Sequence, residues 1–439
     1  MKKKIENRTV HAGIIGLGYV GLPLAVTIAK AGFSVTGIDI NRRKVKRIQQ
    51  GTSDIADVPS EDLAPFVQQG QIQATTDYHV LSELDTISIC VPTPLRKSKD
   101  PDMSFIIAAV EAIAQYIRKD QLIILESTTY PGTTEEIVLP KLEETGLQVG
   151  KDFFLAFSPE RIDPGNKTYS TENTPKIVGG ITPACTEVSQ LFYQQFIHDV
   201  HAVSSTRSAE MVKLLENTFR SVNIGLVNEM ALMCDRMGLD VWEIVEAAAT
   251  KPFGFMPFYP GPGLGGHCIP VDPHYLSWKA KTYEFYARFI ELASEINGSM
   301  PEFVLDKITD ALNRHRKAIN GSKILIMGVA YKKNVGDIRE SPAIDVIRMV
   351  SRRHGEILYH DPYVPELEVE EVGLVDGDST QYICQELTAE LVQNVDCAAI
   401  MTDHTNIDYS WLVNHAAVVV DTRNATKSVM TNRSKIVKI

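Results

Sequence analysis

The stretch Gly16-Leu17-Gly18-Tyr19-Val20-Gly21 decides the fold of the first part of the chain. It follows a short apolar run, Val10–Ile15, that is typical of a buried parallel strand. A helical pattern from Leu22 to Ala31 comes next, and a second strand is predicted over Phe33–Ile38, directly before Asp39. G-x-G-x-x-G between a strand and a helix, with an acidic residue about 20 positions further on, is the dinucleotide-binding pattern of a βαβ unit.

The residue types in this pattern suit a pyrophosphate and a ribose. Glycine allows a tight turn and lets the phosphates approach the N-terminus of the helix. Asp39 can bind the ribose 2′-hydroxyl and would repel a 2′-phosphate, so the sequence favours NAD over NADP. NADP stays open, because Arg42, Arg43 and Lys44 could face a 2′-phosphate. The alternative is that these three residues form a solvated helix face.

Three further strands of this first part each end in polar or turn-forming residues. Ligands of a doubly wound sheet bind outside the carboxyl ends of the strands, so these turns are predicted to line the cofactor cleft. Thr128 alone is equally compatible with capping a helix. The strands and their turns are Thr86–Val91 with Pro92-Thr93-Pro94, Leu122–Glu126 with Ser127-Thr128-Thr129, and Phe153–Phe157 with Ser158-Pro159-Glu160-Arg161.

A second distinctive stretch is the run Gly261–Pro273, which holds four glycines and three prolines. Proline removes a backbone donor and glycine permits positive φ, so the run is predicted to be neither a helix nor a paired strand. It contains Cys268, with Asp272 four residues later. Such a loop suits a place where the backbone and one thiol meet a bound molecule, although a buried, inert cysteine is the alternative.

A helical region begins near Ser205. Apolar residues recur at helical spacing across Glu210–Arg236, a length that suggests a spine joining two domains or pairing with a second subunit. Lys213 and Asn217 are four positions apart and therefore share one face of this helix. Lys213 can equally be an ordinary surface lysine with a buried stem.

Strands and helices alternate again from Ser322. Strands are predicted at 323–327, 356–359, 397–401 and 417–420, with a helix over 343–352. Lys332, Arg339 and Arg423 stand in the turns of this region, where cations suit phosphate. The predicted fold is therefore α/β, with two Rossmann-like doubly wound domains joined by a helical spine: residues 1–204, 205–318 and 319–439.

Composition excludes several classes of protein. The net charge of −11 argues against a nucleic-acid partner, and no apolar run reaches the roughly 18 residues that span a membrane. The lysines at positions 2–4 are not followed by an export signal. The six cysteines are scattered, which indicates reduced thiols in a cytoplasmic protein and neither a disulfide framework nor a metal site.

Taken together, these segments resemble the UDP-sugar 6-dehydrogenases over nearly the whole chain. Those enzymes oxidise the C6 alcohol of a sugar to a carboxylate with two NAD⁺, without releasing the aldehyde. The motifs that carry the resemblance are Gly16–Gly21, Ser127-Thr128, Ser158-Pro159-Glu160, Lys213-x3-Asn217, GxGGxC at Gly263–Cys268, GxAYK at Gly328–Lys332 and DxR at Asp421–Arg423.

The resemblance implies covalent catalysis by Cys268. Its thiolate would add to the intermediate aldehyde as a thiohemiacetal, and the second hydride transfer would give a thioester that water hydrolyses. Lys213 and Asn217 would donate to the developing oxyanion. Glu160 would be the general base or acid of hydrolysis, and Thr128 and Asp272 would orient the water.

The resemblance also implies two sets of binding residues. Those around NAD are Gly16, Gly18, Tyr19, Val20, Gly21, Asp39, Lys44, Thr93, Ser127, Thr128 and Arg339. Those around the UDP-sugar are Glu160, Arg161, Lys213, Asn217, Tyr259, Gly261, Gly265, Tyr331, Lys332 and Arg423.

Two stretches separate this chain from the glucose-oxidising pattern of the family. Arg161-Ile162-Asp163-Pro164-Gly165 follows Glu160, and His267-Cys268-Ile269-Pro270-Val271-Asp272 surrounds the cysteine. Together with Asn173–Gly180, they resemble the UDP-N-acetylhexosamine branch, in which Arg161 would face the acetamido oxygen. We expect UDP-N-acetylglucosamine first, UDP-N-acetylmannosamine second and UDP-glucose third.

Two other functions compete with this interpretation. A single-step dehydrogenase of the 6-phosphogluconate type would share the NAD domain and the helical spine, but it would leave the cysteine loop unexplained. A catalytically silent sugar-nucleotide binder is the other alternative. The long apolar helix favours a homodimer or a larger homo-oligomer.

Overall fold

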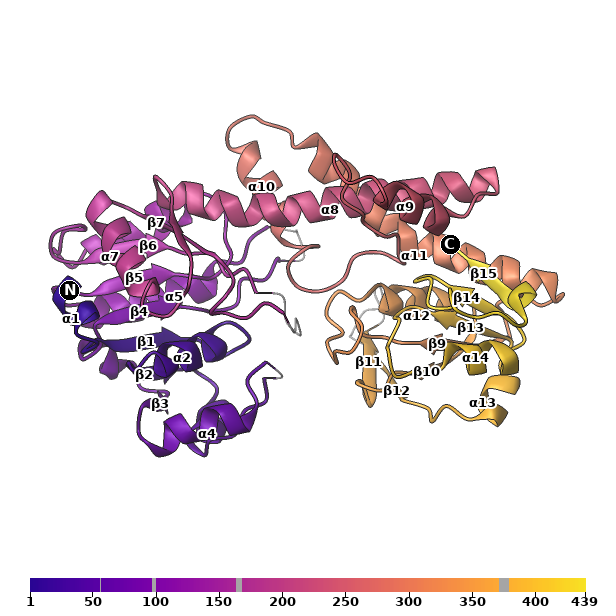
Figure 1. The fold of residues 1–439 in the computed structure, drawn as a ribbon, viewed down its shortest axis with the longest axis horizontal. Coiled ribbons are helices and arrows are strands. Elements are labelled where there is room, and N and C mark those ends of the chain that lie inside the picture. Colours follow the sequence, from indigo (N-terminus) through magenta and orange to yellow (C-terminus); the bar gives the residue numbers. More distant parts are fainter. Residues whose placement is uncertain (56, 97–99, 163–167, 371–378) are drawn as a thin grey trace. The chain divides into compact units, whose positions relative to one another are not determined.

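A computed structural model describes residues 1–55, 57–96, 100–162, 168–370 and 379–439. The chain folds into two compact units, and neither of them is one continuous segment (Figure 1). The first unit comprises Met1–Glu216 with His274–Phe285, and the second comprises Asn217–Pro273 with Tyr286–Ile439.

The first unit is built on an eight-stranded sheet in the order β3-β2-β1-β4-β5-β6-β7-β8. The first six strands in this order, from β3 to β6, are parallel to one another. Strand β7 is antiparallel to β6, and β8 is parallel to β7. The order of the first six confirms the predicted doubly wound arrangement. The strands are β1 (His11–Ile15), β2 (Ser34–Ile38), β3 (Ile72–Thr75), β4 (Thr86–Ile89), β5 (Leu122–Leu125), β6 (Phe154–Phe157), β7 (Lys176–Gly180) and β8 (Val200–Ala202).

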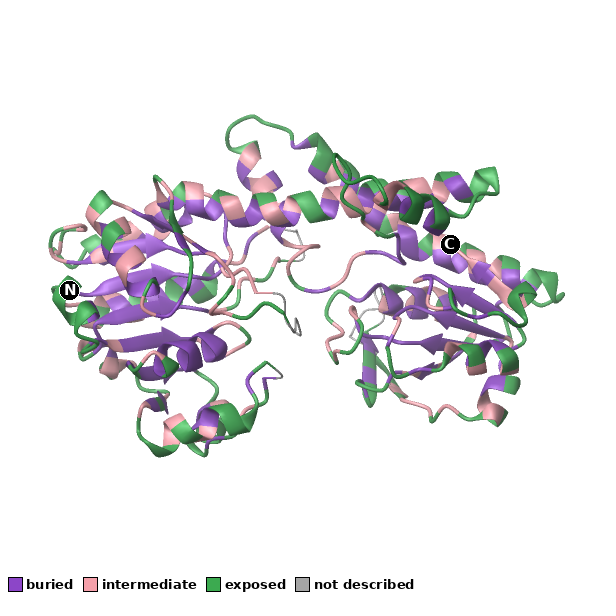
Figure 2. Cartoon of the chain, in the orientation of Figure 1, coloured by how far each residue is buried: buried purple, intermediate pink, exposed green. Residues whose placement is uncertain are grey.

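Helices flank this sheet, and its central strands are buried (Figures 1 and 2). All four residues of β5 are buried, because a parallel strand between covered faces has no solvent side. The helices are α1 (Lys2–Glu6), α2 (Gly21–Lys30), α3 (Arg42–Gln49), α4 (Ser60–Gln68), α5 (Ser104–Tyr116), α6 (Leu139–Glu143) and α7 (Pro183–Tyr193), with short 3-10 and π segments at η1 (Tyr78–Ser82) and η2 (Thr134–Val138).

The second unit holds a five-stranded parallel sheet in the order β10-β9-β13-β14-β15, which is the other common doubly wound order. A two-stranded antiparallel sheet, β11-β12, is not hydrogen-bonded to it but packs on the same hydrophobic core. The strands are β9 (Lys323–Met327), β10 (Glu356–His360), β11 (Glu366–Glu370), β12 (Ser379–Ile383), β13 (Cys397–Ile400), β14 (Val419–Asp421) and β15 (Ile436–Lys438).

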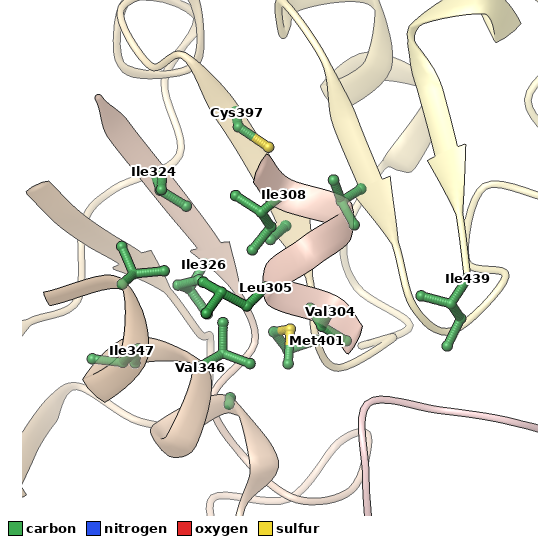
Figure 3. Packing of buried hydrophobic residues seen from close by; sticks show 14 of the residues in the cluster. Val304, Leu305, Ile308, Ile324, Ile326, Val346, Ile347, Cys397, Met401 and Ile439 are labelled. Atoms are coloured by element: carbon green, nitrogen blue, oxygen red, sulfur yellow. The ribbon is translucent and has the colours of Figure 1, made fainter. Parts of the chain in front are cut away.

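One long helix covers a face of the second sheet. Val304, Leu305 and Ile308 of α11 pack against Ile324 and Ile326 of β9 (Figure 3). Each such buried side chain contributes roughly 2 kcal/mol relative to exposure. The helices of this unit are α9 (Val241–Ala249), α11 (Arg288–Arg314), α12 (Pro342–Arg352), α13 (Ala389–Gln393) and α14 (Tyr409–His415), with a 3-10 turn at η3 (Arg433–Lys435).

Helix α8 (Thr206–Met237) runs through 32 residues and contains the boundary between the units. The helical region predicted to begin near Ser205 is therefore confirmed, with its first helix starting at Thr206. Helix α10 (Asp272–Lys281) corrects one prediction, since the last two residues of the glycine- and proline-rich stretch are helical. Pro273 is compatible with this because the first turn of a helix needs no amide donor there.

No helix in the described ranges has both the length and the apolar character needed to cross a membrane. In the same ranges, no group of three or more His, Cys, Asp or Glu residues is arranged to hold a metal ion.

Candidate active site

The glycines of the first loop have three different environments. Gly16 has φ +95°, and a Cβ there would lie 2.4 Å from the carbonyl oxygen of Cys90. At Gly21, where α2 begins, a Cβ would lie 1.9 Å from the oxygen of Gly16. A Cβ at Gly18 would meet no atom within 4 Å. The turn therefore needs Gly16 and Gly21 for its own packing, whereas Gly18 leaves open space of the kind a pyrophosphate requires.

Asp39 lies at the end of β2, beside this loop. Its carboxylate accepts hydrogen bonds from the amides of Leu17 (3.0 Å) and Asn41 (2.8 Å) and from Lys44 Nζ (3.2 Å). Lys44 is thus paired with the acidic residue, which leaves Arg42 and Arg43 on an exposed helix face. The arrangement suits a ribose hydroxyl better than a 2′-phosphate.

The turns after β4 and β5 are tied to each other. Ser127 Oγ donates to the carbonyl oxygens of Val91 (2.8 Å) and Ile89 (3.2 Å). Thr128 is partly buried next to it and is no helix cap, because the following helical segment is preceded by Thr133.

Helix α10 packs on these turns within the first unit. Tyr275 Oη donates to the carbonyl oxygen of Thr93 (2.6 Å), and the rings of Trp278 and Tyr130 lie 5.0 Å apart. Lys279 pairs with Glu136 at 2.7 Å. The helix that follows the cysteine loop therefore supports the backbone of the predicted cofactor turns.

Glu160 is held at several atoms. Its Oε1 accepts from the amides of Arg161 and Ile162, both at 2.7 Å, and its carbonyl oxygen accepts from Lys213 Nζ at 2.5 Å. Lys213 is only 8% exposed, so it is not an ordinary surface lysine. The ammonium group of Lys176 lies 3.8 Å from Glu160 Oε2.

Arg161 forms a two-pronged ion pair with Glu216, at 2.6 Å and 3.3 Å, and donates to the carbonyl oxygen of Pro175 at 2.6 Å. Most of its donor directions are thus already engaged in the first unit. Its contact with a sugar acetamido group stays a prediction. Positions 163–165 of the same predicted specificity segment lie outside the described residues.

Cys268, Asn217 and Asp272 belong to the second unit. Asn217 Nδ2 donates to Asp272 Oδ2 at 2.5 Å, and both residues are buried. The amide of Asp272 donates to the carbonyl oxygen of Cys268 at 2.8 Å, so the partly exposed cysteine stands one turn ahead of α10. Helix N-termini favour thiolates, which suits a nucleophile at this position.

The rest of the glycine-rich loop packs against the second sheet's turns. A Cβ at Gly261 would lie 2.7 Å from Arg423 Nη1, and one at Gly265 would lie 2.6 Å from Tyr331 Cβ. The loop thus brings together residues from the carboxyl ends of β9 and β14, as expected for a nucleotide site of a doubly wound sheet. Tyr259 stacks on Trp242, with 6.0 Å between ring centroids.

Lys332 and Arg339 lie in the same unit. Lys332 is partly buried next to Tyr331. Arg339 pairs with Asp337, at 2.5 Å for the shortest contact, and its carbonyl oxygen accepts from the amide of Gly266. Arg339 was expected beside NAD, yet the NAD loop belongs to the first unit, so that role stays a prediction.

Sequence reasoning gave no role to several buried polar residues of the first unit, among them Glu126, Lys176, Tyr193 and Tyr275. Glu126 could have been noticed, because it is a carboxylate at the end of a predicted apolar strand, directly before Ser127. Lys176 has no comparable signal, since strand β7 was not predicted.

A dinucleotide loop, a cysteine in a glycine-rich loop and a second doubly wound sheet are the features of an NAD-dependent dehydrogenase with two α/β units. Three family models match in chain order: the NAD binding domain at residues 10–197, the central domain at 207–299 and the UDP binding domain at 325–428. The chain belongs to the UDP-glucose/GDP-mannose dehydrogenase family.

Relatives with three different sugar names are similar over most of the chain. A UDP-N-acetyl-D-glucosamine 6-dehydrogenase of Pseudomonas aeruginosa is 36% identical over 81% of this chain and 84% of its own. An NDP-N-acetyl-D-galactosaminuronic acid dehydrogenase of Ralstonia nicotianae is 35% identical over 95% and 96%. The structure of a UDP-D-ManNAc dehydrogenase from Pyrococcus horikoshii superposes with a TM-score of 0.85, at 32% identity over 94% and 96%.

Proposed function

We propose that the protein oxidises the C6 alcohol of a UDP-N-acetylhexosamine to the carboxylate, with UDP-N-acetylglucosamine as the first candidate. The observation that carries this is the buried Asn217–Asp272 pair, one turn from the cysteine of the glycine-rich loop. A simple alcohol dehydrogenase needs no thiol there, whereas a four-electron oxidation needs a nucleophile that holds the aldehyde.

NAD⁺ would accept a hydride in each of two successive oxidations of C6. The Cys268 thiolate adds to the aldehyde formed first, and the resulting thiohemiacetal is oxidised to a thioester. Lys213 and Asn217 donate to the oxyanion at C6, each typically worth a few kcal/mol of barrier. Glu160 takes a proton from the water that attacks the thioester, and the thiolate is released.

Thr128 and Asp272 are proposed to orient that water. The UDP portion is proposed to bind the second unit through Tyr259, Gly261, Gly265, Tyr331, Lys332 and Arg423, whose neighbours were described above. The division into a cofactor part (1–204), a central part (205–318) and a UDP part (319–439) is proposed as the functional organisation of the chain.

The sugar is tested with a panel of UDP-GlcNAc, UDP-ManNAc, UDP-GalNAc and UDP-Glc. We expect the highest kcat/KM with UDP-GlcNAc, two NADH per sugar followed by absorbance, and an acid product. One NADH per sugar would support the single-step alternative, and no NADH with any sugar would support the silent binder.

We further propose that the protein is a homodimer, paired through α8 and the start of α11. Leu226, Met233 and Met237 of α8 are 55%, 45% and 63% exposed, and Phe289 and Leu292 of α11 are 75% and 51% exposed. Apolar side chains gathered on helices of one unit are typical of an interface between subunits.

A further inference from the structure

A buried group of charges lies behind Glu160 in the first unit. Lys176, on β7, pairs with Glu126 at 2.6 Å, and the two side chains are 6% and 0% exposed. Tyr193 Oη donates to the other oxygen of Glu126 at 2.8 Å. Lys176 Nζ also lies 3.4 Å from the carbonyl oxygen of Pro159 and 3.8 Å from Glu160 Oε2.

A buried ion pair of this kind contributes little net stability. Taking two charges out of water costs about as much as their attraction returns, and apolar replacements are often neutral or stabilising. Burial by itself lowers the pKa of Lys176, but the Glu126 and Glu160 carboxylates outweigh it and the net pKa is raised. The ammonium group is therefore charged at neutral pH.

The two carboxylates differ in how far they are engaged. Both oxygens of Glu126 are within hydrogen-bond distance of a donor, one from Tyr193 and one from Lys176. Glu160 has two amides on Oε1, whereas the contact of its Oε2 among the described residues is the ammonium group at 3.8 Å. That distance is too long for a hydrogen bond that would occupy a lone pair of Oε2, so the ammonium group acts on Glu160 through its charge.

We propose that Lys176 is a positioning residue that holds a positive charge beside Glu160, with Oε2 available to accept the proton of the hydrolytic water. This inference rests on the proposed role of Glu160 in thioester hydrolysis. In that step the water oxygen bonds to the thioester carbon, its proton passes to Oε2, and the C–S bond breaks to release the Cys268 thiolate.

Within the described part of the chain, the charged and titratable groups of this cluster come from five elements or their ends. They are Cys90 after β4, Glu126 after β5, Lys176 on β7, Tyr193 on α7 and Lys213 on α8. Glu126 lies beside the same ammonium group as Glu160, and its negative charge offsets part of the positive field of Lys176 at Glu160. Removing Glu126 should therefore strengthen the field of Lys176 at Glu160, and removing Lys176 should weaken it.

The test is the pH profile of thioester hydrolysis in Lys176→Met, Glu126→Gln and the double variant. The acid limb of the profile should shift upward by about one pH unit in Lys176→Met. It should shift downward in Glu126→Gln and fall between wild type and Lys176→Met in the double variant. Well below the limb, Lys176→Met should hydrolyse about tenfold more slowly, and at high pH its rate should approach wild type.

Hydrolysis is measured as decay of the acyl-enzyme in single turnovers, with the covalent adduct followed by intact mass. Lys176→Met leaves the Glu126 charge buried and unpaired; if it fails to fold, the double variant and Glu126→Gln carry the test. Lys307→Met is the control, because this lysine of the second unit is also largely buried and paired with an aspartate, Asp235. Its profile should match wild type.

An equal loss of rate at every pH, or an unshifted limb in the folded variants, would overturn the role of Lys176. A wild-type enzyme that releases two NADH without ever forming an acyl-enzyme would instead refute the proposed function, whatever the variants do.

Discussion

At the scale of single residues, Asn217 and Asp272 stabilise each other in a buried position through one hydrogen bond. An amide and a carboxylate that are buried separately would each carry an unmet hydrogen-bonding group. Paired at 2.5 Å, they are satisfied and their orientation is fixed. The amide of Asp272 also bonds Cys268, so the pair defines where the cysteine backbone lies.

Replacing Cys268 by serine tests the nucleophile directly. A neutral hydroxyl is far less nucleophilic than a thiolate, so acid formation should fall below detection. UDP-sugar and NAD⁺ should still bind with near wild-type Kd by calorimetry, because the binding residues are untouched. Appreciable acid production by Cys268→Ser would contradict covalent catalysis.

Gly18→Ala and Gly21→Ala form a matched pair. A methyl at residue 18 meets no protein atom, so Tm should stay at its wild-type value while NAD⁺ affinity drops at least tenfold. A methyl at residue 21 would collide with the oxygen of Gly16, so Tm and affinity should fall together. Equal Tm losses in both variants would argue against an open approach to Gly18.

At the scale of elements, the segment after β5 is attached to α8 by one buried acid. Glu210 accepts hydrogen bonds from the amides of Gly132 (2.5 Å) and Thr134 (2.9 Å) and from the Thr134 hydroxyl (2.7 Å). Burial raises the pKa of Glu210 to about 7, against the lowering effect of these bonds. The cofactor turn and the long helix thus share a titratable connection.

This connection predicts a pH dependence of stability. Between pH 4.5 and 7 the folded state keeps a proton that the unfolded carboxyl releases, so the contribution of Glu210 is greatest below pH 4.5 and falls as pH rises to about 7. The loss should be about 3 kcal/mol. Denaturant unfolding from pH 4.5 to 7.5 should show it in wild type relative to Glu210→Gln, and parallel curves would refute it.

Local patterns explain which elements were predictable. The segment β1–α2–β2 was predicted because its apolar runs, the spacing of its glycines and the position of Asp39 all indicate the same βαβ structure. Strand β7 was missed because a lysine opens it and its burial depends on a partner 50 positions away, Glu126. Helix α10 was missed because glycines and prolines obscured its start. The pairing of Asn217 with Asp272 depends on tertiary packing, which residue spacing does not reveal.

At the scale of the whole molecule, the exposed apolar residues of α8 and α11 predict how the protein associates. Leu226→Glu combined with Phe289→Glu should convert a dimer to a monomer in light scattering, because two charges would be buried without partners. Met430→Glu is the matched control, since Met430 is 82% exposed outside these helices. A monomeric wild type, or a double variant that remains dimeric, would contradict the proposed interface.

The return of His274–Phe285 to the first unit has a consequence for how the chain is made. On the ribosome, residues 1–216 emerge first, but the helix that carries Tyr275 and Lys279 follows only after residues 217–273 have been synthesised. Until then, Thr93 and Glu136 lack the partners that α10 brings. The nascent cofactor unit therefore remains incomplete until residues 274–285 have been synthesised. We expect a separate peptide of residues 274–285 to bind a released 1–216 fragment.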